Sequence, residues 1–319
     1  SLRYLSALIG GLTVLLSYVF IYKWFSRKIA IFMALLFSFS AFHVSASRLI
    51  IPEVLLPLVL VSLLIALTNA YRTKSVWLFG LSGVIAGLGF YTSPSFLLAP
   101  FIFLAAGFYF FRRNKKFITG YRDELIVATV GFFAVIAPYI VSFSLGSASY
   151  LSYYNFKFSL EDLAINISQI PGLLFLKSSG ENFLNVGHEP LLDPLIFVTS
   201  VAGLVFAILS LSRRKYFFLV VWFLIYSFYA ALRSPLSGID LLGMLPVVYT
   251  FSALIIELVL TKWFETFPID KKAKFFAIGL VAVFFSLSML YNFDRYFVAY
   301  RYSKSVQAEF SETSPIPIK

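Results

Sequence analysis

Long uninterrupted runs of apolar residues alternate along the chain with short polar segments, and this pattern predicts membrane-spanning helices. The runs have 16–21 residues, close to the ~20 that are needed to cross ~30 Å of hydrocarbon. Each run is predicted to be a helix, because a single strand cannot satisfy its backbone polar groups in lipid. The runs are Leu5–Tyr22, Ile29–Ala46, Val54–Ala70, Val76–Tyr91, Phe96–Phe111, Leu125–Leu145, Leu195–Leu211, Phe217–Leu232, Leu242–Leu260 and Phe275–Tyr291. The sequence therefore predicts an all-α, polytopic transmembrane helix bundle with about ten spans.

The composition supports a membrane protein and argues against two other classes. Of the 319 residues, 60% are hydrophobic and only 13% are charged, whereas a soluble domain carries roughly a quarter charged residues. The net charge of +11 comes from short loops rather than from one contiguous basic face, so we expect no nucleic acid partner. The absence of cysteine excludes disulfides and thiolate metal sites.

The Lys and Arg residues gather in alternate connections between the predicted helices. Seventeen of the 26 lie in five short connections, and the positive-inside rule assigns such loops to the cytoplasm. They are Lys23, Arg27, Lys28, Arg72, Lys74, Arg112, Arg113, Lys115, Lys116, Arg122, Arg213, Arg214, Lys215, Lys262, Lys271, Lys272 and Lys274. The intervening connections are then predicted to be extracytoplasmic.

The longest polar segments fall on the predicted extracytoplasmic side. We predict a single transmembrane domain over 1–319, with 146–194 as an extracytoplasmic loop between spans and 292–319 as an extracytoplasmic tail. Loops on a rigid scaffold often carry function, whereas the predicted cytoplasmic loops are short and basic, so any chemistry is expected on the extracytoplasmic face. The chain starts at Ser1 without a signal before its first apolar run, and we expect it to be part of a longer protein.

A cation and a carboxylate stand five residues apart in the stretch SASRLIIPEVLLP, between two apolar runs. Arg48 and Glu53 lie there in a short predicted extracytoplasmic loop, with Pro52 beside the acid. One interpretation is that Arg48 reaches lipid headgroups and that Glu53 occupies a first helical turn, where an anion is favoured. The other is that the planar guanidinium of Arg48 binds a phosphate, while Glu53 orients it or helps to hold an acceptor or metal.

The stretch VGHEPLLDP joins the predicted loop to the next span and holds three titratable residues. His188, Glu189 and Asp193 are residue types that bind a divalent metal or move protons, but their spacing is not a known ligand pattern. We interpret Asp193 as the cap of the helix that starts with Pro194. His188 and Glu189 are candidates for contact with an acceptor, and the need for a metal is left open.

Two further extracytoplasmic connections carry polar side chains. The turn YTSPS contains Thr92 and Ser93, whose hydroxyls either bind phosphate or sugar or simply form a turn. The stretch RSPLSGIDLLGMLP contributes Arg233 and Asp240. None of these patterns is a known catalytic motif.

Two ionisable residues fall inside predicted spans. We interpret His43 as a packing residue near the extracytoplasmic surface. Glu257 is expected to pair with Lys262 or to extend toward the membrane surface. A proton relay would need further buried acids or bases, which the other spans hardly offer.

Six segments, taken in order, resemble the GT-C glycosyltransferases, in particular the dolichyl-phosphate-mannose-protein mannosyltransferase-like branch, glycosyltransferase family 39. Together they are distributed over the stretch from Arg3 to Phe310. The segments are LRYLSALIGGLTVLLSYVF with the basic turn KWFSRK, AFHVSASRLIIPEVLLPL, LSGVIAGLGFYTSPSFLLAP, VGHEPLLDPLIFVTSVAGL, GMLPVVYTFSAL and YFVAYRYSKSVQAEF.

The resemblance implies an enzyme that moves a sugar from a polyprenyl-phosphate donor to a protein or glycan acceptor on the extracytoplasmic face. It places the main acid/base carboxylate of the family in a loop upstream of Ser1, so this chain is expected to lack it. Arg48 and Glu53 match the Arg and the acid of the family motif. The sequence departs from the family at Thr92–Ser93, where relatives have Lys, and at Asp240, where relatives often have Arg.

The resulting assignments are expectations. Glu53 is the catalytic candidate within this chain, either as an acid that supports the residues in contact with the substrates or as an acid on the acceptor side. The donor-phosphate candidates are Arg48, Thr92, Ser93 and Arg233, and the acceptor or loop candidates are His188, Glu189 and Asp240. The protein is predicted to reside in the cell membrane, or in the endoplasmic reticulum of a eukaryote, in contact with membrane lipid. Two alternatives stay open: a transporter or flippase of lipid-linked glycans, and a non-catalytic membrane scaffold.

Overall fold

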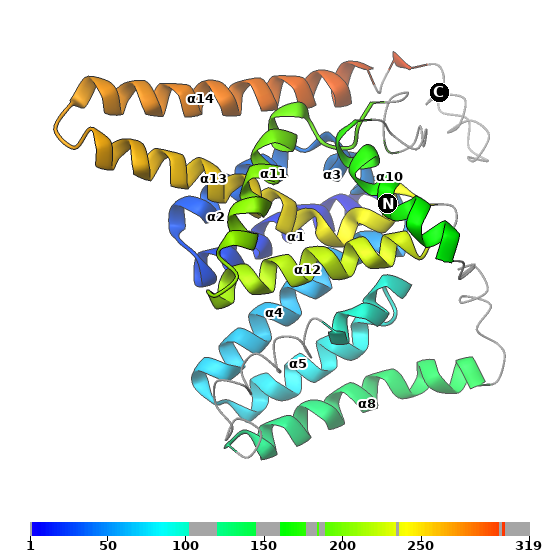
Figure 1. Ribbon diagram of the computed structural model, residues 1–319. Helices are drawn as coiled ribbons and strands as arrows, with labels where there is room; N and C mark the ends of the chain where they lie inside the picture. Colours follow the sequence, from blue (N-terminus) through cyan, green and yellow to red (C-terminus); the bar gives the residue numbers. More distant parts are fainter. Residues whose placement is uncertain are drawn as a thin grey trace.

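The computed structural model describes residues 2–101, 120–144, 160–176, 184, 189–233, 236–299 and 302–303, and its regular structure there is helical (Figure 1). The α-helices are α1 (Leu2–Trp24), α2 (Arg27–Phe39), α3 (Ala41–Ala46), α4 (Leu55–Thr73), α5 (Val76–Gly89), α8 (Arg122–Ser144), α10 (Leu160–Phe175), α11 (Pro194–Leu209), α12 (Arg214–Ala231), α13 (Leu245–Thr266) and α14 (Lys271–Phe293). Short 3-10 turns, η1 (Pro52–Val54), η2 (Pro94–Leu98) and η3 (Gly238–Met244), and the π-helical turn η4 (Asp294–Ala299) lie between or after them. The predicted all-α class is confirmed.

Nine of the ten predicted runs are helices in the described residues, and the tenth, Phe96–Phe111, lies mostly outside them. Five helical segments of the described part are long and apolar enough to cross a membrane. They are Leu2–Trp24, Pro52–Thr73, Arg122–Ser142, Gly238–Thr266 and Lys271–Ala299. The run Ile29–Ala46 divides into α2 and α3 because Ser40 leaves helical geometry, and its side chain accepts a hydrogen bond from the His43 backbone N–H.

The core lies around α13, and two helices form the edges of the bundle. The apolar window of α13 is 89% buried, whereas those of α8 and α14 are only 6% and 11% buried. In Figure 1, α14 runs along one edge and α8 along the opposite edge. Their outer faces carry exposed apolar side chains such as Val130 and Phe275. Such faces suit hydrocarbon rather than water, and the chain is an integral membrane protein.

A helix also lies inside the segment predicted to be an irregular loop. Within 146–194, α10 packs against α12, and the Asn166 side-chain amide donates hydrogen bonds to the carbonyls of Ala231 (3.0 Å) and Arg233 (2.7 Å). Its apolar residues Ile170 and Leu174 are buried and lie four positions apart, a helical spacing. The abundance of Ser, Asn and Tyr in this segment hid that spacing.

The helical connections gather at two ends of the bundle. At one end, which we call the cationic end, the Arg72 guanidinium of α4 donates to the Lys23 carbonyl at the end of α1 (3.0 Å), and the Tyr121 ring before α8 stacks on Tyr71. Figure 1 shows the α4–α5 and α13–α14 turns at its left and α10 at its right. This separation agrees with the predicted alternation of loops, while the side that faces the cytoplasm stays a prediction.

Glycine lets two core helices approach closely. A Cβ atom at Gly203 of α11 would lie 2.0 Å from the Phe251 carbonyl oxygen of α13. Backbone cannot yield as a flexible side chain does, so α11 and α13 would have to separate.

We expect Gly203→Ala to lower the free energy of unfolding by about 1–3 kcal/mol, the usual cost of overpacking. The measurement is thermal unfolding of the purified protein in detergent. Gly279→Ala is the control, because a Cβ atom there meets nothing within 4 Å. Equal transition temperatures for the two variants would contradict the close approach.

Candidate functional site

Four of the predicted site residues lie near one buried tyrosine at the end of the bundle opposite the cationic end. Tyr229, near the end of α12, shares a hydrogen bond with the Ser93 side chain and lies within electrostatic reach of Asp240, Arg233 and Glu53. We call these five residues the Tyr229 cluster. They come from η1, from the turn before η2, from the last turn of α12, from the residues after it and from η3. Elements far apart in the sequence therefore bring a carboxylate, a guanidinium and hydroxyls to one place.

Arg233 and Asp240 form the charged pair of this cluster. The Arg233 Nε donates to the Asp240 Oδ1 at 3.2 Å, and the side chains are 17% and 8% exposed. The other oxygen of Asp240 accepts from the Ser237 backbone N–H at 3.2 Å, which closes a capping box at the start of η3. The Arg233 guanidinium is held in place, because Asp240 is itself fixed by the capping box at the start of η3.

Glu53 enters the cluster from η1. Pro52 begins this turn, and Glu53 lies in its first turn, as the sequence predicted. The side chain is half-buried. Because η1 contacts η3 and leads directly into α4, Glu53 lies on a short segment that is braced from two sides.

The hydroxyls at positions 92 and 93 are buried, and both are used locally. The Thr92 Oγ1 donates to the Gly89 carbonyl at 2.6 Å. The Ser93 Oγ lies 2.9 Å from the Ser95 Oγ and accepts from the Ser95 backbone N–H, which caps η2. Of these two residues, Ser93 is the one that also reaches Tyr229.

Arg48 lies outside the Tyr229 cluster as defined above. It follows α3, its side chain is exposed, and its guanidinium donates to the Tyr296 hydroxyl of η4. The guanidinium carbon also lies 5.7 Å from the centroid of the Tyr296 ring, within the range of a cation–π contact. Arg48 is thus positioned by the segment after α14.

A second polar group joins the start of α11 to the end of α14. Arg295 forms an ion pair with Glu189 at 3.3 Å and donates to the Pro190 carbonyl. Asp193 accepts from the Ile196 backbone N–H and caps α11, which confirms the capping interpretation. Its other oxygen accepts from the side chains of Ser288 and Asn292, each at 2.8 Å. His188, which was predicted as an acceptor contact, lies outside the described residues.

The two ionisable residues within the predicted spans have local partners. The His43 Nε2 lies 3.3 Å from the Gly10 carbonyl oxygen, and its ring centroid lies 4.2 Å from that of Phe37, which fits a packing role. Glu257 accepts from Thr261 at 3.2 Å. Lys262 pairs with Glu265 at 2.6 Å, so the expected pairing of Glu257 with Lys262 is wrong. Lys262 and Glu265 are one helical turn apart, a spacing at which side chains meet readily.

The described part of the chain contains no cluster of side chains that could serve as a metal site. No group of three or more His, Asp or Glu residues lies close enough there to hold an ion.

Sequence reasoning missed four residues that organise these groups: Tyr229, Asn166, Arg295 and Tyr296. Tyr229 lies within an apolar run, and nothing in the local pattern distinguishes it from other span residues. Arg295 was visible as a cation next to Asp294 in the predicted tail, and its buried position follows only from the packing of η4.

Comparison with known proteins bears on the fold that carries this site. Residues 1–141 match the family model of dolichyl-phosphate-mannose-protein mannosyltransferase. The structure resembles the oligosaccharyltransferase AglB from Archaeoglobus fulgidus, solved in complex with an inhibitory peptide and a dolichol-phosphate, with a TM-score of 0.56 and 14% identity over 98% of this chain and 47% of that chain. The resemblance to the GT-C glycosyltransferases is confirmed.

The GT-C fold also relates the chain to ArnT from Cupriavidus metallidurans. The apo structure matches with a TM-score of 0.52 and 13% identity over 97% of this chain and 61% of that chain. The form bound to undecaprenyl phosphate matches with a TM-score of 0.51 and 14% identity over 97% and 62%. The chain thus spans about half to three fifths of the length of these GT-C structures. No curated protein sequence matches it.

Proposed function

We propose that the chain forms the membrane part of a glycosyltransferase that takes a sugar from a polyprenyl-phosphate donor and passes it to a protein or glycan acceptor. The observation that carries the proposal is the Tyr229 cluster, in which Glu53, Ser93, Arg233 and Asp240 meet at one end of a GT-C bundle. The dolichol-phosphate of the AglB structure and the undecaprenyl phosphate of the ArnT structure support the donor class.

The cluster offers the groups that such a transfer needs. A leaving lipid phosphate requires cationic or hydrogen-bonding groups that stabilise its charge, and Arg233 and Ser93 are the candidates on the described elements. An acceptor must lose a proton to a carboxylate, and Glu53 is the candidate of this chain beside the acid/base residue that the family carries elsewhere. Asp240 holds Arg233 in position, and we assign it to acceptor contact.

Arg48 supplies a second cation at the same end of the bundle. It is exposed, and its guanidinium is steadied by Tyr296, so a phosphate at the membrane surface can approach it without displacing a buried group. A planar fork of donors suits a phosphodiester. We assign Arg48 to the donor phosphate and Glu189, on the segment that leads into α11, to acceptor contact.

The proposed working face is extracytoplasmic. The support is the Lys and Arg bias, which assigns the cationic end to the cytoplasm and leaves the Tyr229 cluster on the other side. The prenyl chain of the donor would then remain in the bilayer while its phosphate meets Arg48 and Arg233.

We expect Arg48→Ala in the full-length protein to reduce the transfer of radiolabelled sugar from polyprenyl phosphate by about 10–100-fold. This is less than the ~100–1000-fold that follows the loss of one preorganised donor, because the Arg48 side chain is exposed. Expression should stay unchanged, and the free energy of unfolding should fall by no more than about 1 kcal/mol, because the exposed side chain loses only its contact with Tyr296. The control is Arg3→Ala, which removes an exposed Arg near the start of α1.

Unchanged transfer by the Arg48 variant would refute its assignment. Transbilayer movement of a labelled lipid-linked glycan without any sugar transfer by the unmodified protein would instead favour the flippase alternative.

A further inference from the structure

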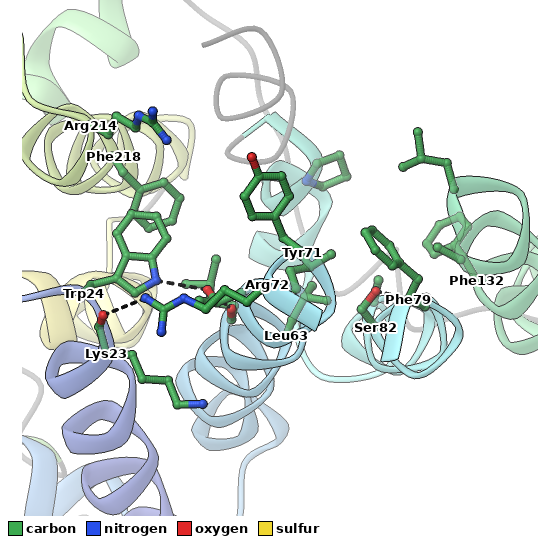
Figure 2. Close-up of a pocket in the computed structure, with 18 of the residues that line it drawn as sticks. Lys23, Trp24, Leu63, Tyr71, Arg72, Phe79, Ser82, Phe132, Arg214 and Phe218 are labelled. Carbon is green, nitrogen blue, oxygen red and sulfur yellow. Dashed lines mark hydrogen bonds between the residues drawn. The ribbon is translucent and has the colours of Figure 1, made fainter. Parts of the chain in front are cut away.

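A large apolar cavity opens at the cationic end of the bundle, away from the Tyr229 cluster. It has a volume of about 960 Å³, the upper part of the range for ligand pockets. It lies between α4, α5 and α8 on one side and the ends of α1 and α12 on the other. Figure 2 shows Trp24 and Phe218 on one wall and Phe79 and Phe132 on the opposite wall. The proposed transfer assigns no role to this cavity.

Positive charge lies at the mouth of this cavity. Among the described residues that line it, five are Lys or Arg and none is acidic. Arg72 is anchored by its hydrogen bond to the Lys23 carbonyl, and the Lys23 ammonium donates to Asn69. Arg213 and Arg214, at the start of α12, are exposed. Figure 2 shows Arg214 above Trp24 and Phe218, and the Arg72 guanidinium and Lys23 below them.

The depth of the cavity corresponds to a single leaflet. Its lining residues on α4 run from Arg72 at the cationic end to Leu63, and the nine helical steps between them extend about 14 Å. Half of the hydrocarbon core is about 15 Å thick. Trp24 and Tyr71 stand beside the cations at the mouth, where aromatic residues mark the boundary between hydrocarbon and headgroups. The inner part of the cavity, at the depth of the acyl chains, is therefore apolar, and its mouth, at the level of the headgroups, is cationic.

We propose that this cavity binds a two-chain phospholipid with an anionic headgroup, taken from the leaflet at the cationic end. The headgroup phosphate would be held by Arg72, Arg213 and Arg214, because Arg donors suit phosphate geometry, and basic pockets between transmembrane helices bind anionic lipids. The acyl chains would lie against Leu63, Phe79 and Phe132. A polyprenyl chain fits the cavity less well, since it is longer than one leaflet is deep.

The test is native mass spectrometry of the purified full-length protein in detergent containing equal amounts of phosphatidylglycerol and phosphatidylcholine. We expect retained phosphatidylglycerol to exceed phosphatidylcholine, and the combined variant R72Q/R213Q/R214Q to retain ~10–100-fold less of it, given the contribution of each cation near headgroups. The matched control is K271Q/K272Q/K274Q, which removes three charges from the start of α14. Figure 1 shows that helix on the far side of the bundle from α4 and α5.

A second variant addresses the apolar part of the cavity and leaves the cations intact. Thr129, on the exposed face of α8, lines the cavity, and T129W should occupy part of it and lower phospholipid retention as well. Equal retention of both phospholipids, equal losses in the two triple variants, or displacement of phosphatidylglycerol by an equal amount of polyprenyl phosphate would each overturn the proposal. Sugar transfer is not part of the readout, so failure here leaves the proposed function intact.

Discussion

Asp193→Ala is expected to lower the free energy of unfolding by about 3–7 kcal/mol, because a buried carboxylate with three hydrogen bonds joins two helices. Asp193 is 3% exposed and accepts from the Ile196 backbone N–H, the Ser288 hydroxyl and the Asn292 amide. Its removal costs the N-cap of α11, typically about 1 kcal/mol. It also leaves two buried donors without an acceptor, at about 1–3 kcal/mol each.

The loss should extend beyond α11, since Asn292 also accepts from the Ala41 backbone N–H at 2.9 Å. The start of α3 would therefore lose support together with α14. Thermal unfolding in detergent measures the effect.

Asp270→Ala is the matched control for this prediction. Asp270 also caps a helix, α14, and accepts from the backbone N–H groups of Lys272 and Ala273, but it is exposed. Its loss should cost only about 1 kcal/mol. If the two variants unfold at the same temperature, Asp193 acts as a simple cap and the cross-link from α11 to α14 contributes nothing measurable.

Arg233→Ala is expected to reduce sugar transfer by about 100–1000-fold, the usual cost of losing one donor that stabilises a developing negative charge. The same change should destabilise the protein by about 3–5 kcal/mol, because it leaves Asp240 buried without its cation. The two effects need to be separated, since a poorly folded variant also transfers little sugar.

The double variant R233A/D240A separates these effects. With both charges removed, the Asp240 carboxylate is no longer left buried without its cation, so most of the lost stability should return. Transfer should remain low, because the proposed donor-phosphate ligand is still missing. Recovery of transfer together with stability would show that Arg233 only supports η3 and does not bind the donor.

Most of the helices were predictable, because a long apolar run indicates a segment that spans the hydrocarbon of a membrane as a helix. The runs that became α1, α4, α8 and α13 lie within two or three residues of the observed helices at most ends. The break at Ser40 and the helix α10 were not predicted. Both depend on contacts with distant segments: Asn292 binds the backbone next to Ser40, and α10 packs on α12.

The residues of the candidate site could be predicted from the sequence, but which of them lie close together could not. Glu53, Ser93, Arg233 and Asp240 were each singled out from local patterns, and the structure brings them together around Tyr229. Arg48 was expected beside Glu53 because they are close in sequence, yet its described contacts are with Tyr296 of η4. Closeness along the chain says little here, since a turn such as η1 directs neighbouring side chains to different helices.

The sequence by itself determined which segments lie in the hydrocarbon of the membrane and which lie in water, because the transfer of an apolar run into hydrocarbon depends on its length and composition. It also determined the separation of cations and other polar groups onto alternate connections. Only the tertiary structure decided which polar side chains meet, which aspartate cross-links two helices, and that a cavity opens beside the cations of the cationic end. These properties arise from contacts between residues as much as 251 positions apart, and no local pattern encodes such contacts.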